Sequence, residues 1–344
     1  MRLKYHYSLV RPVIVILVII SLIVFYKLTL NTTIYNKHIK YKTTQTTILL
    51  PLERDFILNI HSKNNIRNDI HLNVHSYTKR NQVKMFKPGD RDPRLVSRQV
   101  KLRTPHGKVT IFVYPAHVDK MISSYVADYS TWEEDLLNQT ARLMRRFPGS
   151  AFIDVGCNVG VYTLFMASLG VDVVAIDPVR ANLDLLSQSV DADNFTGRVT
   201  LIHNAVSNVY RSIVMEIPED NVGGAHFADI TTDKHSNDTT QNSAETVLLD
   251  DIIPFVKNRQ VIIKMDIEGH EQNVLEGAKT FFQTIDTRVI LMEWVHHRYR
   301  AEGQTIINTM VGHGFLPFAD DNLNTVIEPG RYHRWPENVF WIKR

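Results

Sequence analysis

Short apolar runs alternate with amphipathic segments from residue 148 to the end of the chain. Apolar runs bounded by turn residues predict buried strands, and longer segments with apolar residues three or four positions apart predict helices. The expected strands are 151–155, 171–177, 198–203, 260–266 and 287–294, with closing apolar runs at 314–319 and 338–343. Helices are expected over 162–169 and 181–190, from 266 through Phe282, and after 294. The alternation predicts an α/β fold with a doubly wound, mostly parallel sheet.

The N-terminus follows a different pattern. Pro12 to Tyr26 reads PVIVILVIISLIVFY, with one serine and no charge. With its apolar flanks, this run approaches the roughly 20 residues that cross a bilayer as a helix. No small-residue cleavage site follows, and no polar face is present, so an anchor is favoured over a signal peptide or a core helix. We expect a short tail at 1–11 and a transmembrane signal anchor at 12–30.

Charge is distributed unevenly along the chain. The total is +3, yet residues 27–108 hold 17 Lys and Arg against five acids, and 109–344 carries a net charge of −12. This contrast predicts a basic stem or linker at 31–108 and a separate domain at 109–344. No nucleic acid is expected as a partner, because the basic residues lack aromatic interleaving and any zinc or helix-turn-helix signature. The single cysteine, Cys157, excludes an intramolecular disulfide.

Acidic and glycine residues mark the ends of the first two predicted strands. The first strand runs into Asp154-Val-Gly156-Cys-Asn158-Val-Gly160, and Asp177 ends the second. An acid at the second position accepts ribose hydroxyls in nucleoside-binding folds, and the glycines allow a sharp turn and a close helix approach. The pattern predicts a nucleoside pocket. The alternative is a strand-capping acid with packing glycines.

Several segments resemble one family of enzymes. FIDVGCNVGVYT, VVAIDPVRAN and LIHNAVS resemble motifs I to III of class I S-adenosylmethionine-dependent methyltransferases. IIKMDIEGHEQNVLEGA at 262–278 is similar to the hallmark of the FkbM methyltransferase family, and TVLLDDII, LMEW and NVFWIK fit the same family. The resemblance covers about 110–344 and implies S-adenosylmethionine as the cofactor. It implies a cofactor site around the methionine part, the ribose and the adenine, formed by Asp154, Gly156, Asn158, Gly160, Thr163, Asp177, Asn204 and Ala205.

The fourth predicted strand and its following turn supply candidates for the chemistry. Alternation places Ile262, Lys264 and Asp266 on one face, and a charged pair on an apolar strand is costly unless it is paired or functional. The candidate catalytic residues are Lys264, Asp266, Glu268, His270 and Glu293. His270 is the natural base because an ordinary histidine titrates near neutrality. Asp266 and its neighbouring acids suit a divalent cation, although their spacing does not establish one.

Other features near these strands have a structural interpretation, and some also have a functional one. Glu271 is interpreted as a helix-capping acid. His226, after Gly223 and Gly224, either faces the acceptor or belongs to a simple turn. The aromatic and basic cluster at 294–300 either stacks on a sugar ring or packs the next helix.

Together these features predict an O-methyltransferase that uses S-adenosylmethionine and acts on a sugar hydroxyl of a glycan. Sequons at Asn31, Asn138, Asn194 and Asn237 lie after the predicted anchor. We therefore expect a single-pass type II protein of the Golgi or endoplasmic reticulum with a lumenal catalytic domain. The alternatives are a lipid or small-molecule hydroxyl as the acceptor, or a catalytically inactive methyltransferase fold that serves as a binding protein.

Overall fold

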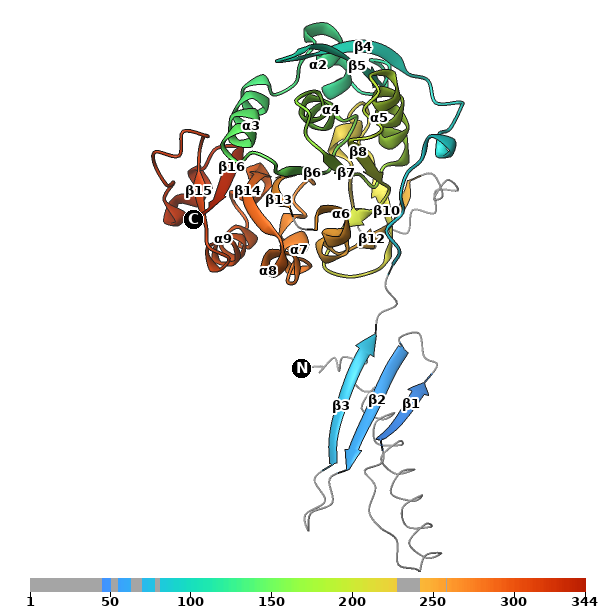
Figure 1. Ribbon diagram of the computed structural model, residues 1–344, viewed down its shortest axis with the longest axis vertical. Coiled ribbons are helices and arrows are strands. Elements are labelled where there is room, and N and C mark those ends of the chain that lie inside the picture. The colour runs from blue at the N-terminus through green and yellow to red at the C-terminus, as the bar shows by residue number, and fades with distance from the viewer. Residues whose placement is uncertain (1–44, 51–54, 63–69, 78–80, 228–241, 258) are drawn as a thin grey trace, which may run out of the picture. The chain divides into compact units, whose positions relative to one another are not determined.

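The computed structural model describes residues 45–50, 55–62, 70–77, 81–227, 242–257 and 259–344. The chain divides into two units, 1–77 and 78–344, which are considered separately (Figure 1). The predicted tail at 1–11 and anchor at 12–30 lie outside the described residues. Among the helices that are described, none has the length and apolar character needed to cross a membrane.

The first unit contains a three-stranded antiparallel sheet in the order β1-β2-β3. Its strands are β1 (Gln45–Leu50), β2 (Asp55–Ser62) and β3 (Ile70–Tyr77). Alternating apolar and polar residues in IHLNVHSY are typical of antiparallel strands. Part of the segment predicted to be a stem therefore forms a sheet.

The second unit begins at Thr78, well before the boundary at 109 that the charge pattern predicted. Strand β4 (Arg98–Thr104) pairs with β5 (Gly107–Val113) in an antiparallel hairpin. Leu102 of β4 is fully buried, whereas the basic residues of that strand are exposed. The net charge of a segment reports its exposed face, so it did not reveal that alternate residues enter the core.

A seven-stranded sheet organises this unit in the order β15-β16-β14-β13-β6-β7-β8. Five strands are parallel: β6 (Ala151–Val155), β7 (Val173–Ile176), β8 (Val199–Ile202), β13 (Gln260–Met265) and β14 (Asp286–Glu293). β16 (Asn338–Lys343) runs antiparallel between β14 and β15 (Phe315–Phe318). The strands predicted from the apolar runs are confirmed, as is the doubly wound, mostly parallel sheet.

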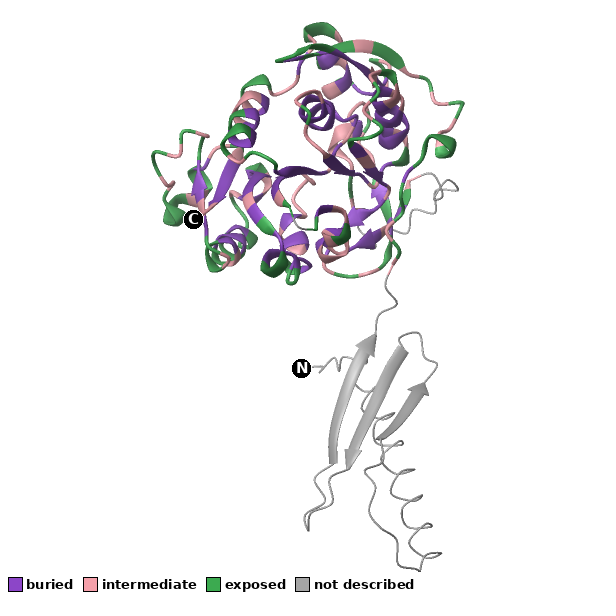
Figure 2. Ribbon diagram, in the orientation of Figure 1, coloured by how far each residue is buried: buried purple, intermediate pink, exposed green. Residues whose placement is uncertain are grey.

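Two hydrophobic clusters cover the two faces of this sheet, and Figure 2 shows the buried residues concentrated on the strands and on the helix sides facing them. β13 separates the clusters, because Ile262 belongs to one while Val261 and Ile263 belong to the other. The first cluster packs against α2 (Ile122–Tyr129), α3 (Glu134–Arg146), α4 (Val161–Ser168) and α5 (Arg180–Ala192). The second packs against α6 (Ile253–Val256), α7 (Glu271–Glu276), α8 (Phe281–Thr284) and α9 (Glu302–Gly312).

The single helix expected from 266 through Phe282 is in fact two short helices, α7 and α8. The break follows Gly277, where an added Cβ would lie 2.3 Å from the backbone oxygen of Ser207. Ser207 directly follows β9 (Ala205–Val206). The backbone at Gly277 therefore passes so close to this segment that a side chain would not fit there.

A second, four-stranded sheet lies between β8 and β13 in sequence, where an irregular polar segment was expected. Its order is β11-β10-β12-β9, with β10 (Ser212–Glu216), β11 (His226–Phe227) and β12 (Ser243–Val247). The 3-10 helices are η1 (Pro88–Asp90), η2 (Val222–Gly224), η3 (Leu249–Ile252), η4 (Val295–His297) and η5 (Pro329–Arg334). Residues 228–241, within the expected polar loop, lie outside the described residues.

Candidate active site

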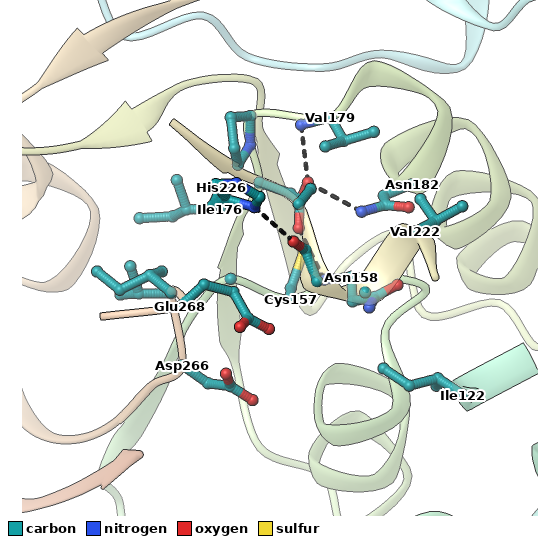
Figure 3. A pocket seen from close by; sticks show the side chains of 18 of the residues that line it. Ile122, Cys157, Asn158, Ile176, Val179, Asn182, Val222, His226, Asp266 and Glu268 are labelled. Carbon is teal, nitrogen blue, oxygen red and sulfur yellow. Dashed lines mark hydrogen bonds between the residues drawn. The ribbon is translucent and has the colours of Figure 1, made fainter. Parts of the chain in front are cut away.

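A pocket of about 280 Å³ opens at the carboxyl ends of the central parallel strands. Its floor is formed by residues that follow β6, β7 and β13, including Gly156, Asp177 and Asp266. Ligands bind at this edge in open α/β sheets because the strand order reverses there and leaves a crevice. The small sheet contributes His226 and Phe227, and Figure 3 shows how the labelled side chains surround the pocket.

The glycine turn after β6 brings the backbone close to the next strand. Gly156 has φ 80°, and a Cβ there would lie 2.0 Å from the Asp266 backbone oxygen. Gly160 has φ 92° and packs against Leu186 of α5, so this glycine serves helix packing and does not line the pocket. Cys157 is buried, and burial raises the pKa of its thiol well above the ordinary value. An unreactive, packed thiol agrees with that environment.

Asp177 is the best-defined polar group of the pocket. Its Oδ1 accepts hydrogen bonds from the Val179 backbone N at 2.8 Å and Asn182 Nδ2 at 3.1 Å, while Oδ2 accepts one from the Asn158 backbone N at 2.8 Å (Figure 3). Burial raises the pKa of Asp177 to about 6, and these three hydrogen bonds oppose that rise. The carboxylate is thus fixed in place at the pocket wall.

Asn204 and Ala205 also line the pocket, at the start of the small sheet. The Asn204 side chain is engaged on both sides: Oδ1 accepts from the Lys84 backbone N at 2.7 Å, and Nδ2 donates to the Glu245 backbone oxygen at 3.0 Å. Its amide therefore ties the segment before β4 to β12, in addition to forming part of the wall.

Asp154 and Thr163 lie beneath the pocket and do not line it. Thr163 Oγ1 donates to Asp154 Oδ2 at 2.6 Å, while Asp154 Oδ1 has no hydrogen-bond partner among the described residues. Burial raises the pKa of Asp154, and the positive charge of Lys264 opposes this. The sequence predicted both residues to lie near the turn as part of the cofactor site. In the structure they lie near the turn but below the pocket surface.

Lys264 connects the buried acids to the pocket. Its Nζ lies 2.9 Å from Asp266 Oδ2 and 4.9 Å from the centre of the Tyr162 ring. Burial alone would lower the pKa of Lys264, but the attraction of Asp266, Asp154 and Glu133 outweighs it and raises the pKa. The sequence placed Lys264 and Asp266 on one face and left open whether they are paired or functional; in the structure Lys264 donates a hydrogen bond to Asp266.

Glu133 is a pocket residue that the sequence did not indicate. It precedes α3 with φ 46°, and its Oε2 accepts a hydrogen bond from the Tyr162 hydroxyl at 2.9 Å. Burial raises the pKa of this carboxyl, with Lys264 opposing the rise. Glu133 stands outside every recognised motif, and only the packing of α3 against α4 brings it to the pocket.

His270 lines the pocket, but its environment differs from the one expected for a base. Nε2 lies 3.0 Å from Ser207 Oγ, and the ring centre lies 4.1 Å from that of Phe227 in β11. Burial lowers the pKa of His270 to about 4, and the charge of Arg211 lowers it further. The near-neutral pKa assumed from the sequence is therefore not found, because the small sheet covers the ring.

Glu268, Glu293 and His296 form a second polar cluster at the pocket. His296 Nε2 lies 3.1 Å from Glu268 Oε2 and 3.4 Å from Glu293 Oε2. Burial and the charges of Asp266 and Glu268 raise the pKa of Glu293 to about 10. One ligand atom from each of the three lies within 4.8 Å of the others, a spacing that can hold a divalent cation.

Two residues of the aromatic and basic cluster after β14, Trp294 and His297, are buried in the core. Trp294 is fully buried and packs against Trp335 and Trp341, which agrees with the packing interpretation and not with stacking on a sugar. His297 Nε2 lies 2.7 Å from Glu271 Oε2, and Glu271 Oε1 accepts from the Ile267 backbone N at 3.1 Å. Glu271 therefore stands at the start of α7 as expected and also fixes the turn that carries Glu268.

Comparison with known proteins finds one family model that matches part of the chain, and several similar solved structures. Residues 154–317 match the family model of the methyltransferase FkbM domain. Similar solved structures include an rRNA methylase from Streptococcus thermophilus (TM-score 0.34, 13% identity, 61% of this chain and 96% of that chain). A magnesium protoporphyrin IX methyltransferase from Synechocystis PCC 6803 with bound SAM is similar over 61% of this chain and 78% of that chain (TM-score 0.34, 12% identity).

The T. Thermophilus 16S rRNA N2 G1207 methyltransferase, in complex with AdoMet and guanosine, is similar over 73% of this chain and 52% of that chain (TM-score 0.37, 13% identity). No curated protein sequence matches the chain. The sheet order, with a single reversed strand, and the family match together give a class I methyltransferase-like α/β fold. The resemblance drawn from the sequence motifs is confirmed.

Proposed function

Because residues 154–317 match the family model of the methyltransferase FkbM domain, we propose that the chain binds S-adenosylmethionine in this pocket and methylates a sugar hydroxyl of a glycan. The observation that carries the cofactor assignment is the buried Asp177 carboxylate beside the Gly156 turn. Such a carboxylate accepts ribose hydroxyls, and the turn leaves room for a ligand close to the backbone.

The charge of the pocket also fits this cofactor. Glu133, Asp177, Asp266 and Glu268 line it, and among the described lining residues Lys264 is the one Lys or Arg, already paired with Asp266. An excess of carboxyl groups attracts a ligand that carries a sulfonium and an ammonium group. The residues present therefore fit S-adenosylmethionine in both hydrogen bonding and charge.

When bound, S-adenosylmethionine supplies an electrophilic methyl group. Attack of the acceptor oxygen on that methyl carbon would form the O–C bond and leave the electrons of the C–S bond on sulfur, and a base of the protein would take the hydroxyl proton. We assign the base to Glu268, whose carboxylate lines the pocket beside His296. A positioned base contributes about 10²- to 10⁴-fold to rate. His270, bonded to Ser207 and stacked on Phe227, positions the small sheet over the site.

The proposal extends to the location of the enzyme. The apolar run at 12–30 would anchor a single-pass type II protein in the Golgi or endoplasmic reticulum membrane, with the site in the lumen. Exposure of Asn194, one of the four sequons, supports this placement. Glycosidase treatment of the expressed chain tests it: a mobility shift is expected, and an unchanged mobility of a fully expressed chain argues for the opposite orientation.

Two measurements on the full chain test the activity. Calorimetry should detect S-adenosylmethionine binding, and labelled methyl should appear on neutral glycans in a panel that also contains lipid and small-molecule hydroxyls. Transfer only to the lipid or small-molecule hydroxyls would contradict the glycan acceptor. Absence of cofactor binding would favour an inactive binding protein. A chelator arm tests the cation, since loss of transfer restored by Mn²⁺ or Mg²⁺ would show that transfer needs a divalent cation, for which Glu268, Glu293 and His296 are the candidate ligands.

A further inference from the structure

Three aromatic side chains form a patch on α2 and in the turn before α3. The rings of Tyr125 and Tyr129 lie 4.5 Å apart, centre to centre, and the edge-to-face contact of Tyr125 with Trp132 spans 5.4 Å. Tyr125 is 42% exposed and Tyr129 is 60% exposed. We refer to Tyr125, Tyr129 and Trp132 as the aromatic platform.

The two tyrosines of the platform do not hold α2 to the core. Its buried residues are Ser123 and Val126, and the tyrosines stand one turn apart on a different side of the helix. Large aromatic rings left partly in water and touching one another indicate a binding surface more often than a packing requirement. The residues that α2 buries are therefore Ser123 and Val126, while both tyrosine rings remain partly exposed.

The platform continues the wall of the pocket. Trp132 lines the pocket together with Met121 and Ile122 from the same part of the chain. Figure 3 shows Ile122 across the pocket from Asp266 and Glu268. Trp132 therefore connects the pocket wall to Tyr125, whose ring it contacts.

Charge restricts what this molecule can be. Among the described lining residues, Lys264 is the one Lys or Arg and it is bonded to Asp266, while Glu133 and Glu268 add negative charge. A phosphate or carboxylate on the acceptor would find repulsion here and no free cation. An uncharged sugar avoids that repulsion, and the C–H face of its ring is attracted to the negative face of an aromatic ring.

We infer that the aromatic platform is the acceptor subsite and holds an uncharged sugar ring stacked on its side chains. Trp132 contacts the sugar that presents its hydroxyl to the pocket, and Tyr125 and Tyr129 contact the neighbouring sugar. This inference rests on the proposed methyl transfer for the reaction that follows binding, but the stacking itself is measurable without that reaction.

The test is saturation-transfer NMR on the full chain, with glucose, lactose, cellobiose and mannobiose as neutral probes and glucose 6-phosphate as an anionic probe. At least one neutral disaccharide should bind, and glucose 6-phosphate should bind more weakly than glucose. Tyr125→Ala and Tyr129→Ala should each weaken binding about 3- to 10-fold, which is the range for loss of one aromatic contact. Tyr125→Phe should retain the wild-type affinity within about twofold, because it keeps the ring.

Tyr299→Ala is the matched control, since Tyr299 is 87% exposed and does not line the pocket. S-adenosylmethionine affinity, measured on the same samples, should stay within about twofold in every variant. Cofactor binding without any bound neutral disaccharide, or equal binding by wild type and Tyr125→Ala, overturns the subsite. Stronger binding of glucose 6-phosphate than of glucose also overturns it. Sugar binding without cofactor binding keeps the subsite and overturns the proposed transfer.

Discussion

Replacement of Asp177 by Asn tests the cofactor site most directly. Both carboxylate oxygens already accept hydrogen bonds from the protein, two at Oδ1 and one at Oδ2. An asparagine that keeps its oxygen at the Oδ1 position turns its NH₂ group toward the Asn158 backbone N–H. The variant therefore loses a charged acceptor for the ribose and also loosens the glycine turn.

The expected loss follows from the strength of such bonds. A hydrogen bond to a charged group contributes about 1.5–3 kcal/mol, so S-adenosylmethionine should bind roughly 10- to 100-fold more weakly to Asp177→Asn. Asp172→Asn is the matched control, because Asp172 stands just before the same strand at its opposite end and pairs with Arg259 on the surface. Isothermal titration of both variants measures the difference.

The pH dependence of cofactor binding is a second, independent test of the Asp177 assignment. The ribose hydroxyls donate to the ionised carboxylate, so binding favours that form and affinity should fall as pH drops through the Asp177 pKa of about 6. At pH 5 about a tenth of this carboxyl is ionised, which predicts roughly tenfold weaker binding than at pH 7.5. Asp177→Asn should lack this component. Wild-type affinity in Asp177→Asn, or an identical pH profile in both proteins, would refute the assignment.

Three further variants test the rest of the site. Gly156→Ala should abolish cofactor binding or folding, because its Cβ would lie 2.0 Å from a backbone oxygen; a wild-type melting temperature and affinity would contradict the close approach. Lys264→Met should lower the free energy of unfolding, measured by urea titration, by about 3 kcal/mol. The reason is that Asp266 loses its ion-pair partner and Asp154 loses the positive charge that opposes its burial. Lys279→Met, at an exposed position, is the control. Glu268→Gln should slow single-turnover transfer about 100-fold or more, while His270→Ala slows it less and leaves the pH profile unchanged; the reverse order would make His270 the base.

Residues at the ends of parallel strands were predictable from the sequence. Asp154, Asp177 and Asp266 each end an apolar run, and the carboxyl ends of parallel strands meet at one edge of a sheet. Once the strands were identified, the sequence therefore predicted that these three acids lie near one another. Whether each acid enters the pocket did not follow, because Asp154 is turned below the surface toward Thr163.

The parts that sequence reasoning missed depend on contacts between distant segments. β10 pairs with β12 across residues 217–242 and also with β11, and the β10–β11 pairing places Phe227 beside His270, whose pKa is lowered by burial. Likewise, Leu102 enters the core from a strand whose three basic residues are exposed. In both cases the apolar pattern is short, and its partner lies far away in sequence, so periodicity alone does not identify it.

Charge conservation connects the acids of the pocket with the proposed reaction. Methyl transfer removes one positive charge from sulfur, and the acceptor hydroxyl releases one proton. If Glu268 takes that proton, the carboxylate loses its negative charge as the sulfonium loses its positive charge, and the pocket keeps the same net charge throughout. A basic residue without a partner would repel the sulfonium and so weaken cofactor binding before the reaction starts. The pairing of Lys264 with Asp266 prevents this, because the lysine's charge is already compensated by the protein itself.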